Sequence, residues 1–170
     1  MENIQFKIIN QDMVPSILDF MEEHYYHDEP ICRSLGINRN WMSDELFKET
    51  MKDGSSIAAL DKGGNIIGVR LGIRIKKPTW MSKMMDQMPN FVYPDWFSTF
   101  MKLTSLVGYD VSKMFDQLGC DMIYEDTAVC SSRATGVRGL GTELCRRTET
   151  LAKELGCTHT YACVTGNLSM

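Results

Sequence analysis

Three glycines within six residues constrain this chain more than any other feature of its sequence. Gly136, Gly139 and Gly141 lie between an apolar run and a regular helical pattern. Glycine lets the backbone adopt positive φ and approach a ligand closely. The first turn of a helix also offers unpaired N–H groups at the positive end of its dipole. The segment 131–144 therefore predicts a cradle for a phosphate or pyrophosphate group.

The composition is that of one domain in aqueous solution. The 170 residues are 44% hydrophobic and 24% charged, which is ordinary for a single globular unit. The start of the chain lacks a signal peptide's apolar stretch, and no run approaches the roughly 18 apolar residues that span a bilayer. The net charge of −4, without a basic stripe, argues against a nucleic-acid surface. We expect a cytoplasmic monomer with neither nucleic acid nor membrane as partner.

The cysteines do not form a disulfide or metal framework. No C-x-x-C pair occurs, and the histidines have no ligand-like spacing with the cysteines. We expect buried, reduced thiols and no metal. The cysteines are Cys32, Cys120, Cys130, Cys145, Cys157 and Cys163, and the histidines are His24, His27 and His159.

Hydrophobic periodicity predicts an α/β domain over residues 1–170, in the order β-α-α-β-β-(helical insert)-β-α-β. Strands are expected at 5–9, in the two arms of a hairpin within 56–77, at 122–129 and at 158–165. Helices are expected at 13–25, 41–52, 81–88, 96–107 and 110–118, and after the glycine loop. This last helix would bury Leu140, Leu144, Thr148, Leu151 and Leu155.

The glycine loop, taken with this order of elements, resembles the R/Q-x-x-G-x-G/A pyrophosphate motif of the GNAT superfamily of acetyl-CoA-dependent N-acetyltransferases. Two registers are possible. Arg133-x-x-Gly136-x-Arg138 has the leading arginine but ends in arginine, whereas Gly136-x-x-Gly139-x-Gly141 has both glycines but no leading arginine or glutamine. The second register is closer to the helix start, which favours it for phosphate contacts. The resemblance implies an α/β (α+β) fold with a mixed central sheet flanked by helices.

Two further segments resemble the invertebrate arylalkylamine, or dopamine-type, N-acetyltransferases of that superfamily. They are YYHDEPICRSLGI (25–37) and CTHTYACVTGNLS (157–169). The resemblance assigns the general base to Glu29 of the D-E-P motif. It also places a pair of catalytic hydroxyls at Thr165 and Ser169, either of which could protonate the departing CoA thiolate. Capping of a following helix would explain these hydroxyls equally well. The resemblance further implies a helix and two strands beyond Met170.

The same resemblance implies the remaining contacts to acetyl-CoA. Backbone N–H groups of the fourth predicted strand would face the acetyl carbonyl, although the side chains there suit a core equally well. These residues are Ala128 and Val129. The loop and the first helical turn would bind the phosphates through Arg133, Gly136, Val137, Arg138, Gly139, Leu140, Gly141 and Thr142. An aryl pocket, or simply a core, would be formed by Tyr25, Tyr26, Trp80, Phe91, Tyr93, Trp96, Phe97 and Phe100.

The resemblance implies transfer of acetyl from acetyl-CoA to an arylalkylamine by direct attack, without a metal. The same chemistry on a polyamine, and a non-catalytic acyl-CoA-binding domain, remain alternatives. A Rossmann domain is excluded, because its glycine turn follows the first strand of a βαβ unit, whereas this one follows the fourth predicted strand.

Overall fold

The architecture is that of a computed structural model, which describes residues 3–41, 43–77, 96, 98, 99, 102 and 111–162. Five strands form one sheet in the order β1-β2-β3-β4-β5. Successive neighbours are antiparallel as far as β4, and β5 runs parallel to β4. The strands are β1 (Gln5–Ile8), β2 (Ile57–Leu60), β3 (Ile66–Lys76), β4 (Met122–Ser131) and β5 (His159–Ala162). The predicted mixed central sheet is therefore confirmed.

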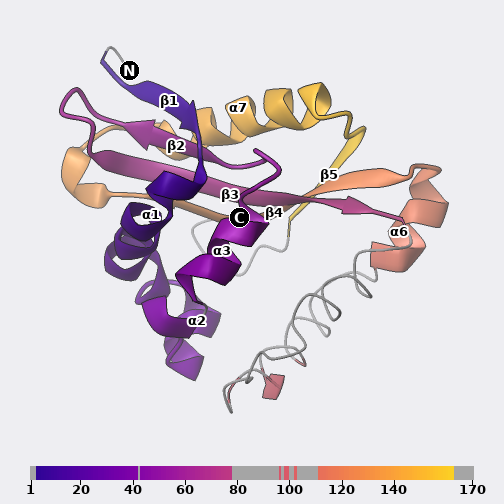
Figure 1. Cartoon of the computed structure of the whole chain (residues 1–170), viewed down its shortest axis with the longest axis horizontal. Helices are drawn as coiled ribbons and strands as arrows, with labels where there is room; N and C mark the ends of the chain where they lie inside the picture. The colour runs from indigo at the N-terminus through magenta and orange to yellow at the C-terminus, as the bar shows by residue number, and fades with distance from the viewer. Residues whose placement is uncertain are drawn as a thin grey trace.

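Helices cover both faces of the sheet (Figure 1). On one face lie α1 (Val14–Met21), α2 (Pro30–Leu35) and α3 (Asp44–Thr50), with α6 (Val111–Leu118) against the far end of β3 and β4. The long helix α7 (Leu140–Glu154) packs on the opposite face. Short turns are η1 (Gln11–Met13), the π-helical η2 (Glu22–Tyr26), η3 (Arg39–Trp41) and η4 (Arg133–Thr135). No helix in the described ranges is long and apolar enough to cross a membrane.

The alternation of β2 divides the core into two layers. Ala58 and Leu60 face α1–α3, whereas Ile57 and Ala59 face α7, and all four side chains are buried. Successive strand residues point to opposite faces, so one short apolar strand supplies both layers. The predicted buried face of α7 is confirmed at Leu140, Leu144, Thr148 and Leu151, whereas Leu155 is half-buried.

Two predicted helices differ from those observed. The helix expected over 13–25 begins with η1, continues as α1, and widens into the π-helical turn η2. The helix expected over 41–52 starts only at Asp44, after the separate turn η3. Periodicity could not detect either change, because apolar spacing alone does not distinguish α-helical from 3₁₀ or π turns. The helices expected at 81–88 and 96–107 lie largely outside the described residues.

Candidate active site

The glycine loop connects the end of β4 to α7 through two left-handed residues. After the turn η4, Gly136 has φ of 62° and Gly139 has φ of 76°. A side chain in this region costs roughly 1–2 kcal/mol, so both positions require glycine for the backbone to turn. Gly141 is different, because it lies inside the first helical turn and a Cβ there would meet no atom within 4 Å.

The N-terminus of α7 presents backbone donors at this loop. Gly139 is the N-cap residue, and the helical hydrogen bond from the Glu143 N–H reaches its carbonyl at 3.0 Å. The N–H groups of Leu140, Gly141 and Thr142 precede that bond and have no acceptor within the helix. Gly139 as N-cap corresponds to the second predicted register. The Leu140 side chain is buried and Val137 is half-buried, while Arg138 and Thr142 are exposed.

The loop is joined to the D-E-P segment by an ion pair. The Arg133 guanidinium lies 3.4 Å from the Asp28 carboxylate, and both side chains are largely exposed. Arg133 thus stands next to the segment that carries Glu29, although the two are far apart in the sequence. Exposed pairs of this kind contribute little to folding stability. The contact instead shows that the predicted base segment and the predicted phosphate loop meet at one edge of the structure.

Glu29 begins α2. One of its oxygens, Oε2, accepts a hydrogen bond from the Cys32 backbone N–H at 2.5 Å, and Pro30 occupies the first helical position. An acidic N-cap followed by proline is a favourable helix start. The side chain is half-buried. Glu29 therefore combines the predicted catalytic position with a structural role that the sequence did not reveal.

Glu29 interacts electrostatically with the buried thiol of Cys32 and with the half-buried Tyr25. Burial, followed by the hydrogen bond and charge of Glu29, raises the pKa of the Cys32 thiol. Burial also raises the pKa of Tyr25, with further contributions from Cys32 and Glu29. Cys130 of β4 completes this group, because its thiol contacts the His24 carbonyl at 3.1 Å and burial raises its pKa to about 12. The Cys32 and Cys130 thiols are thus protonated at neutral pH.

A β-bulge in β4 lies beside this group. Leu71 of β3 pairs with Ala128, but the next residue, Gly72, pairs with Asp126, so Thr127 is the extra residue. Ala128 packs against the core around α1–α3. Val129 is 41% exposed, which corrects the alternative that its side chain fills the core. Bulges bend a strand and redirect its backbone groups, here at the two residues predicted to face the acetyl carbonyl.

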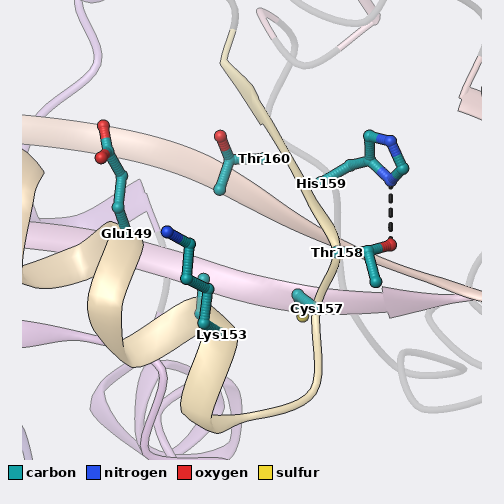
Figure 2. Close-up of a pocket in the computed structure, with 7 residues that line it drawn as sticks. Glu149, Lys153, Cys157, Thr158, His159 and Thr160 are labelled. Atoms are coloured by element: carbon teal, nitrogen blue, oxygen red, sulfur yellow. Dashed lines mark hydrogen bonds between the residues drawn. The ribbon is translucent and has the colours of Figure 1, made fainter.

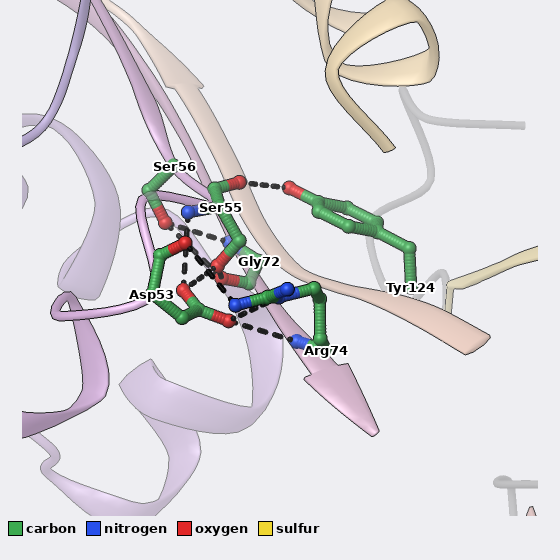
Figure 3. A network of polar contacts seen from close by, with 6 residues as sticks. All are labelled: Asp53, Ser55, Ser56, Gly72, Arg74 and Tyr124. Atoms are coloured by element: carbon green, nitrogen blue, oxygen red, sulfur yellow. Dashed lines mark hydrogen bonds and ion pairs between the residues drawn. The ribbon is translucent and has the colours of Figure 1, made fainter. Parts of the chain in front are cut away.

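A buried polar network holds β3 opposite the bulge (Figure 3). The Tyr124 hydroxyl donates to the Ser55 carbonyl at 2.5 Å and would lie 2.1 Å from a Cβ on Gly72. The Gly72 N–H donates to Ser56 Oγ at 3.1 Å, and Ser55 Oγ donates to the Gly72 carbonyl at 2.5 Å. Arg74 extends the network, since its Nε donates to Asp53 at 3.2 Å. In the sequence, only Gly72 inside a strand signals this network, which was not predicted.

Two carboxylates of β4 occupy opposite faces of the sheet. Asp126 faces α7 and forms a bidentate ion pair with Arg70, with a Nε–Oδ1 distance of 2.7 Å. Glu125 points to the other face, in register with Ile73 of β3 and Tyr161 of β5. Burial and the charge of Asp126 raise the pKa of Glu125. Sequence reasoning singled out neither carboxylate.

A separate hollow of about 190 Å³ lies between the C-terminal half of α7 and β5 (Figure 2). Its lining includes Glu149, Lys153, Cys157 and His159. It is therefore at the opposite end of α7 from the glycine loop. Nothing in its lining belongs to the predicted site.

Several predicted site residues lie outside the described residues. These are the hydroxyl pair Thr165 and Ser169 and the aromatics Trp80, Phe91, Tyr93, Phe97 and Phe100. Of the remaining aromatics, Tyr26 is buried in the core around α1–α3, and Tyr25 and Trp96 pack against it. Within the described ranges, no group of three or more histidine, cysteine or acidic residues is arranged to hold a metal ion.

Comparison with solved structures identifies the fold. Arylalkylamine N-acetyltransferase 2 from Aedes aegypti superposes with a TM-score of 0.80 and 23% identity, over 99% of this chain and 79% of that one. The polyamine N-acetyltransferase of Drosophila melanogaster, which forms N-acetylagmatine, gives 0.78 and 15%, over 98% and 78%. The chain has the GNAT acetyltransferase fold. This GNAT fold agrees with the one that the glycine loop and D-E-P motif implied. No protein-family model and no curated protein sequence matches the chain.

Proposed function

We propose that this protein is an acetyl-CoA-dependent N-acetyltransferase that acetylates the primary amine of an arylalkylamine. Dopamine, tyramine, octopamine and serotonin exemplify the substrate class. The observation that carries the proposal is the contact between the loop and the D-E-P segment through Arg133 and Asp28. This ion pair joins the glycine loop, which we propose as the phosphate cradle, to the segment that carries the half-buried Glu29. The solved examples of the fold include N-acetyltransferases of arylalkylamines.

Acetyl-CoA binds at the start of α7 in this proposal. Its pyrophosphate accepts hydrogen bonds from N–H groups of the loop and the first helical turn, where the helix dipole favours negative charge. Gly136 and Gly139 supply the backbone turn that this arrangement needs. Arg133 and Arg138 add positive charge at the rim. The full contact set is Arg133, Gly136, Val137, Arg138, Gly139, Leu140, Gly141 and Thr142.

Glu29 acts as a general base. An arylalkylamine is mostly protonated at neutral pH, and only the neutral amine attacks a thioester. A carboxylate in a poorly solvated position can accept a proton from the nitrogen, and such help is worth about 10²–10⁴-fold in rate. The buried thiols of Cys32 and Cys130 are poor nucleophiles, which favours direct attack by the amine over an acetyl-cysteine intermediate.

The bulged part of β4 stabilises the reaction's negative charge. As the amine attacks, the acetyl carbonyl oxygen becomes an oxyanion, and a fixed backbone donor lowers the energy of that state. Ala128 and Val129 are the proposed donors. The C–S bond then breaks, and Thr165 or Ser169 delivers a proton to the CoA thiolate.

The experiment compares CoA release from acetyl-CoA and tyramine by wild type, Glu29→Gln and Glu29→Ala. Glutamine retains an oxygen that can accept the Cys32 N–H, whereas alanine removes both the helix cap and the carboxylate. We expect both variants to lose about 10²-fold or more in kcat/KM, with only the alanine variant losing stability as well. Unchanged turnover in the glutamine variant would contradict the assignment of Glu29 as the general base.

A polyamine or agmatine substrate is the second candidate, because two structural neighbours are agmatine and polyamine N-acetyltransferases. An amine panel separates the two candidates. Tyramine and phenethylamine should give higher kcat/KM than agmatine and putrescine if the arylalkylamine proposal is right. The reverse order would favour the polyamine candidate.

A further inference from the structure

Glu125 and the proposed oxyanion donor Ala128 are close together on β4, opposite two β3 residues that are two positions apart. On β3, Leu71 pairs with Ala128 and Ile73 pairs with Glu125. Residues two apart on a strand are roughly 7 Å apart and point to the same face. Because Thr127 is the bulged residue, Glu125 and Ala128 flank the bulge on the face that α1–α3 cover. Both are therefore on the same face of the sheet as Glu29 and the Tyr25–Cys32–Cys130 group.

The position of Glu125 lies between two apolar clusters on that face. Leu71 and Ala128 belong to the core around α1–α3, while Ile73 and Tyr161 pack against the separate cluster around α6. The side chain is half-buried. It has no hydrogen bond or ion pair among the described residues, and Arg70 is engaged with Asp126 on the other face. A carboxylate placed among apolar side chains without a cation is costly to keep ionised.

The stoichiometry of amine acetylation calls for more than one proton acceptor. An ammonium nitrogen carries three protons, and the amide product carries one. Of the two protons removed, one leaves on the thiol of CoA and the other is released to solvent. The ammonium must lose its proton before attack, and the nitrogen loses the second after the new C–N bond forms.

We propose that Glu125 binds the ammonium group of the incoming amine and accepts its first proton. This inference rests on the proposed function. The transfer converts R–NH3⁺ and the Glu125 carboxylate into R–NH2 and a carboxylic acid, which later returns the proton to solvent. Glu29 then takes the proton that the nitrogen loses after attack, rather than the first one. The amine attacks the thioester, the C–S bond breaks, and this second proton passes from the nitrogen through Glu29 and Thr165 or Ser169 to the thiolate.

The division of roles follows from the hydrogen bonds of the two glutamates. One oxygen of Glu29 is engaged by the Cys32 N–H at the start of α2. Within the described part of the chain, neither oxygen of Glu125 forms a hydrogen bond or an ion pair, so both can contact a ligand. Burial raises the pKa of Glu125. A general base is most effective when its pKa lies near the working pH, and the shift of Glu125 is in that direction. The titratable groups on the same face are Tyr161 and His159 of β5 and, around α1–α3, Tyr25, Glu29, Cys32 and Cys130.

The test compares Glu125→Gln with wild type on two amines, phenethylamine and its β,β-difluoro analogue. Fluorine makes the ammonium of the analogue far more acidic, so much of it is neutral without a protein base. We expect Glu125→Gln to lose about 10²-fold or more in kcat/KM with phenethylamine. With the analogue the loss should shrink at least tenfold, and the acid limb of the kcat/KM pH profile should move. Glu154→Gln, at the exposed end of α7, is the matched control and should behave as wild type.

Each outcome decides the inference. An equal loss with both amines, or no loss with either, would overturn it while the acetyltransferase proposal stands. A wild-type protein that acetylates no amine would overturn both. If Glu125→Gln does not fold, Glu125→Asp serves instead, since it keeps a carboxylate that is one methylene shorter. The aspartate variant should lose more activity on phenethylamine than on the analogue, and equal losses would contradict the proposal.

Discussion

The Asp28 carboxylate and the Arg133 guanidinium meet at 3.4 Å, which connects the segment before α2 to the loop before α7. A phosphate group can accept the same bidentate hydrogen bonds from arginine as a carboxylate. The exposed pair with Asp28 is weak, so in the proposed complex Arg133 exchanges Asp28 for a phosphate of acetyl-CoA. Binding of acetyl-CoA at α7 would then release the segment that carries Glu29 from this contact.

Arg133→Ala should weaken acetyl-CoA binding without unfolding the protein. The exposed pair is worth at most about 1 kcal/mol in stability, so the melting temperature should hardly change. Titration calorimetry with CoA should show a several-fold weaker affinity. Asp28→Asn is the matched control, and it should bind CoA as tightly as wild type or more tightly, because it frees the arginine. Equal CoA affinity in wild type and Arg133→Ala would contradict the assignment.

Alanine substitutions of Gly139 and Gly141, at the start of α7, should have different effects on stability. Gly139→Ala places a side chain at φ of 76° and should lower the free energy of unfolding by about 1–2 kcal/mol. Gly141→Ala meets no atom within 4 Å and should leave stability unchanged or raise it by up to about 1 kcal/mol. Its methyl group would nevertheless stand where the phosphates approach, so CoA affinity should fall. Urea unfolding and calorimetry measure the two effects separately, and a Gly141→Ala variant with wild-type CoA affinity would place the phosphates elsewhere.

Gly72→Ala should damage both stability and turnover. Its Cβ would lie 2.1 Å from the Tyr124 hydroxyl, and overpacking of a buried site costs typically about 1–3 kcal/mol. Because Gly72 is opposite the bulge at Thr127, the displacement should also move the Ala128 N–H and reduce kcat.

Tyr124→Phe tests the hydroxyl alone. It leaves the buried Ser55 carbonyl without its donor, which should lower the free energy of unfolding by about 1–3 kcal/mol. Denaturant unfolding and steady-state kinetics on both variants check this, and wild-type stability in Gly72→Ala would contradict the packing.

The protein should lose stability in alkaline solution. The Cys130 thiol has a pKa raised by burial from 9.0 to about 12, and burial raises the pKa of Cys32 and Tyr25 in the same direction. Below pH 9 the thiols are protonated in the folded and unfolded states alike. Above it the unfolded chain releases protons that the folded protein retains, so the free energy of unfolding falls as pH rises. Urea unfolding across this range should show a smaller decline in Cys130→Ala, and an equal decline would contradict the burial of that thiol.

The regular parts of the fold could be predicted because their signals are local. The turn residues between β2 and β3 gave the hairpin, and the spacing of Leu140, Leu144 and Leu151 gave α7. The π-helical turn at η2 and the bulge at Thr127 could not be predicted in this way. Both depend on packing against distant segments, which apolar periodicity does not record.

The candidate site was predictable to a similar extent. Gly136 and Gly139 have the left-handed conformations that a glycine loop needs, and Glu29 is next to the loop's partner Asp28. The role of Glu29 as the N-cap of α2 was not predicted. Glu125 gave no signal in the sequence, because a charged residue in a strand usually indicates a solvated face. Only the bulge and the pairing with Ile73 show that it lies on the face that carries the site.

Amine-dependent release of CoA is the most direct test of the proposed acetyltransferase activity. Full-length protein is incubated with acetyl-CoA and tyramine, the CoA thiol is measured over time, and the product is identified by mass spectrometry. We expect CoA release that requires the amine and equals the N-acetyltyramine formed, mole for mole. A protein that binds CoA in calorimetry but releases none faster with any arylalkylamine, polyamine or agmatine would contradict it, and would instead be an acyl-CoA-binding domain.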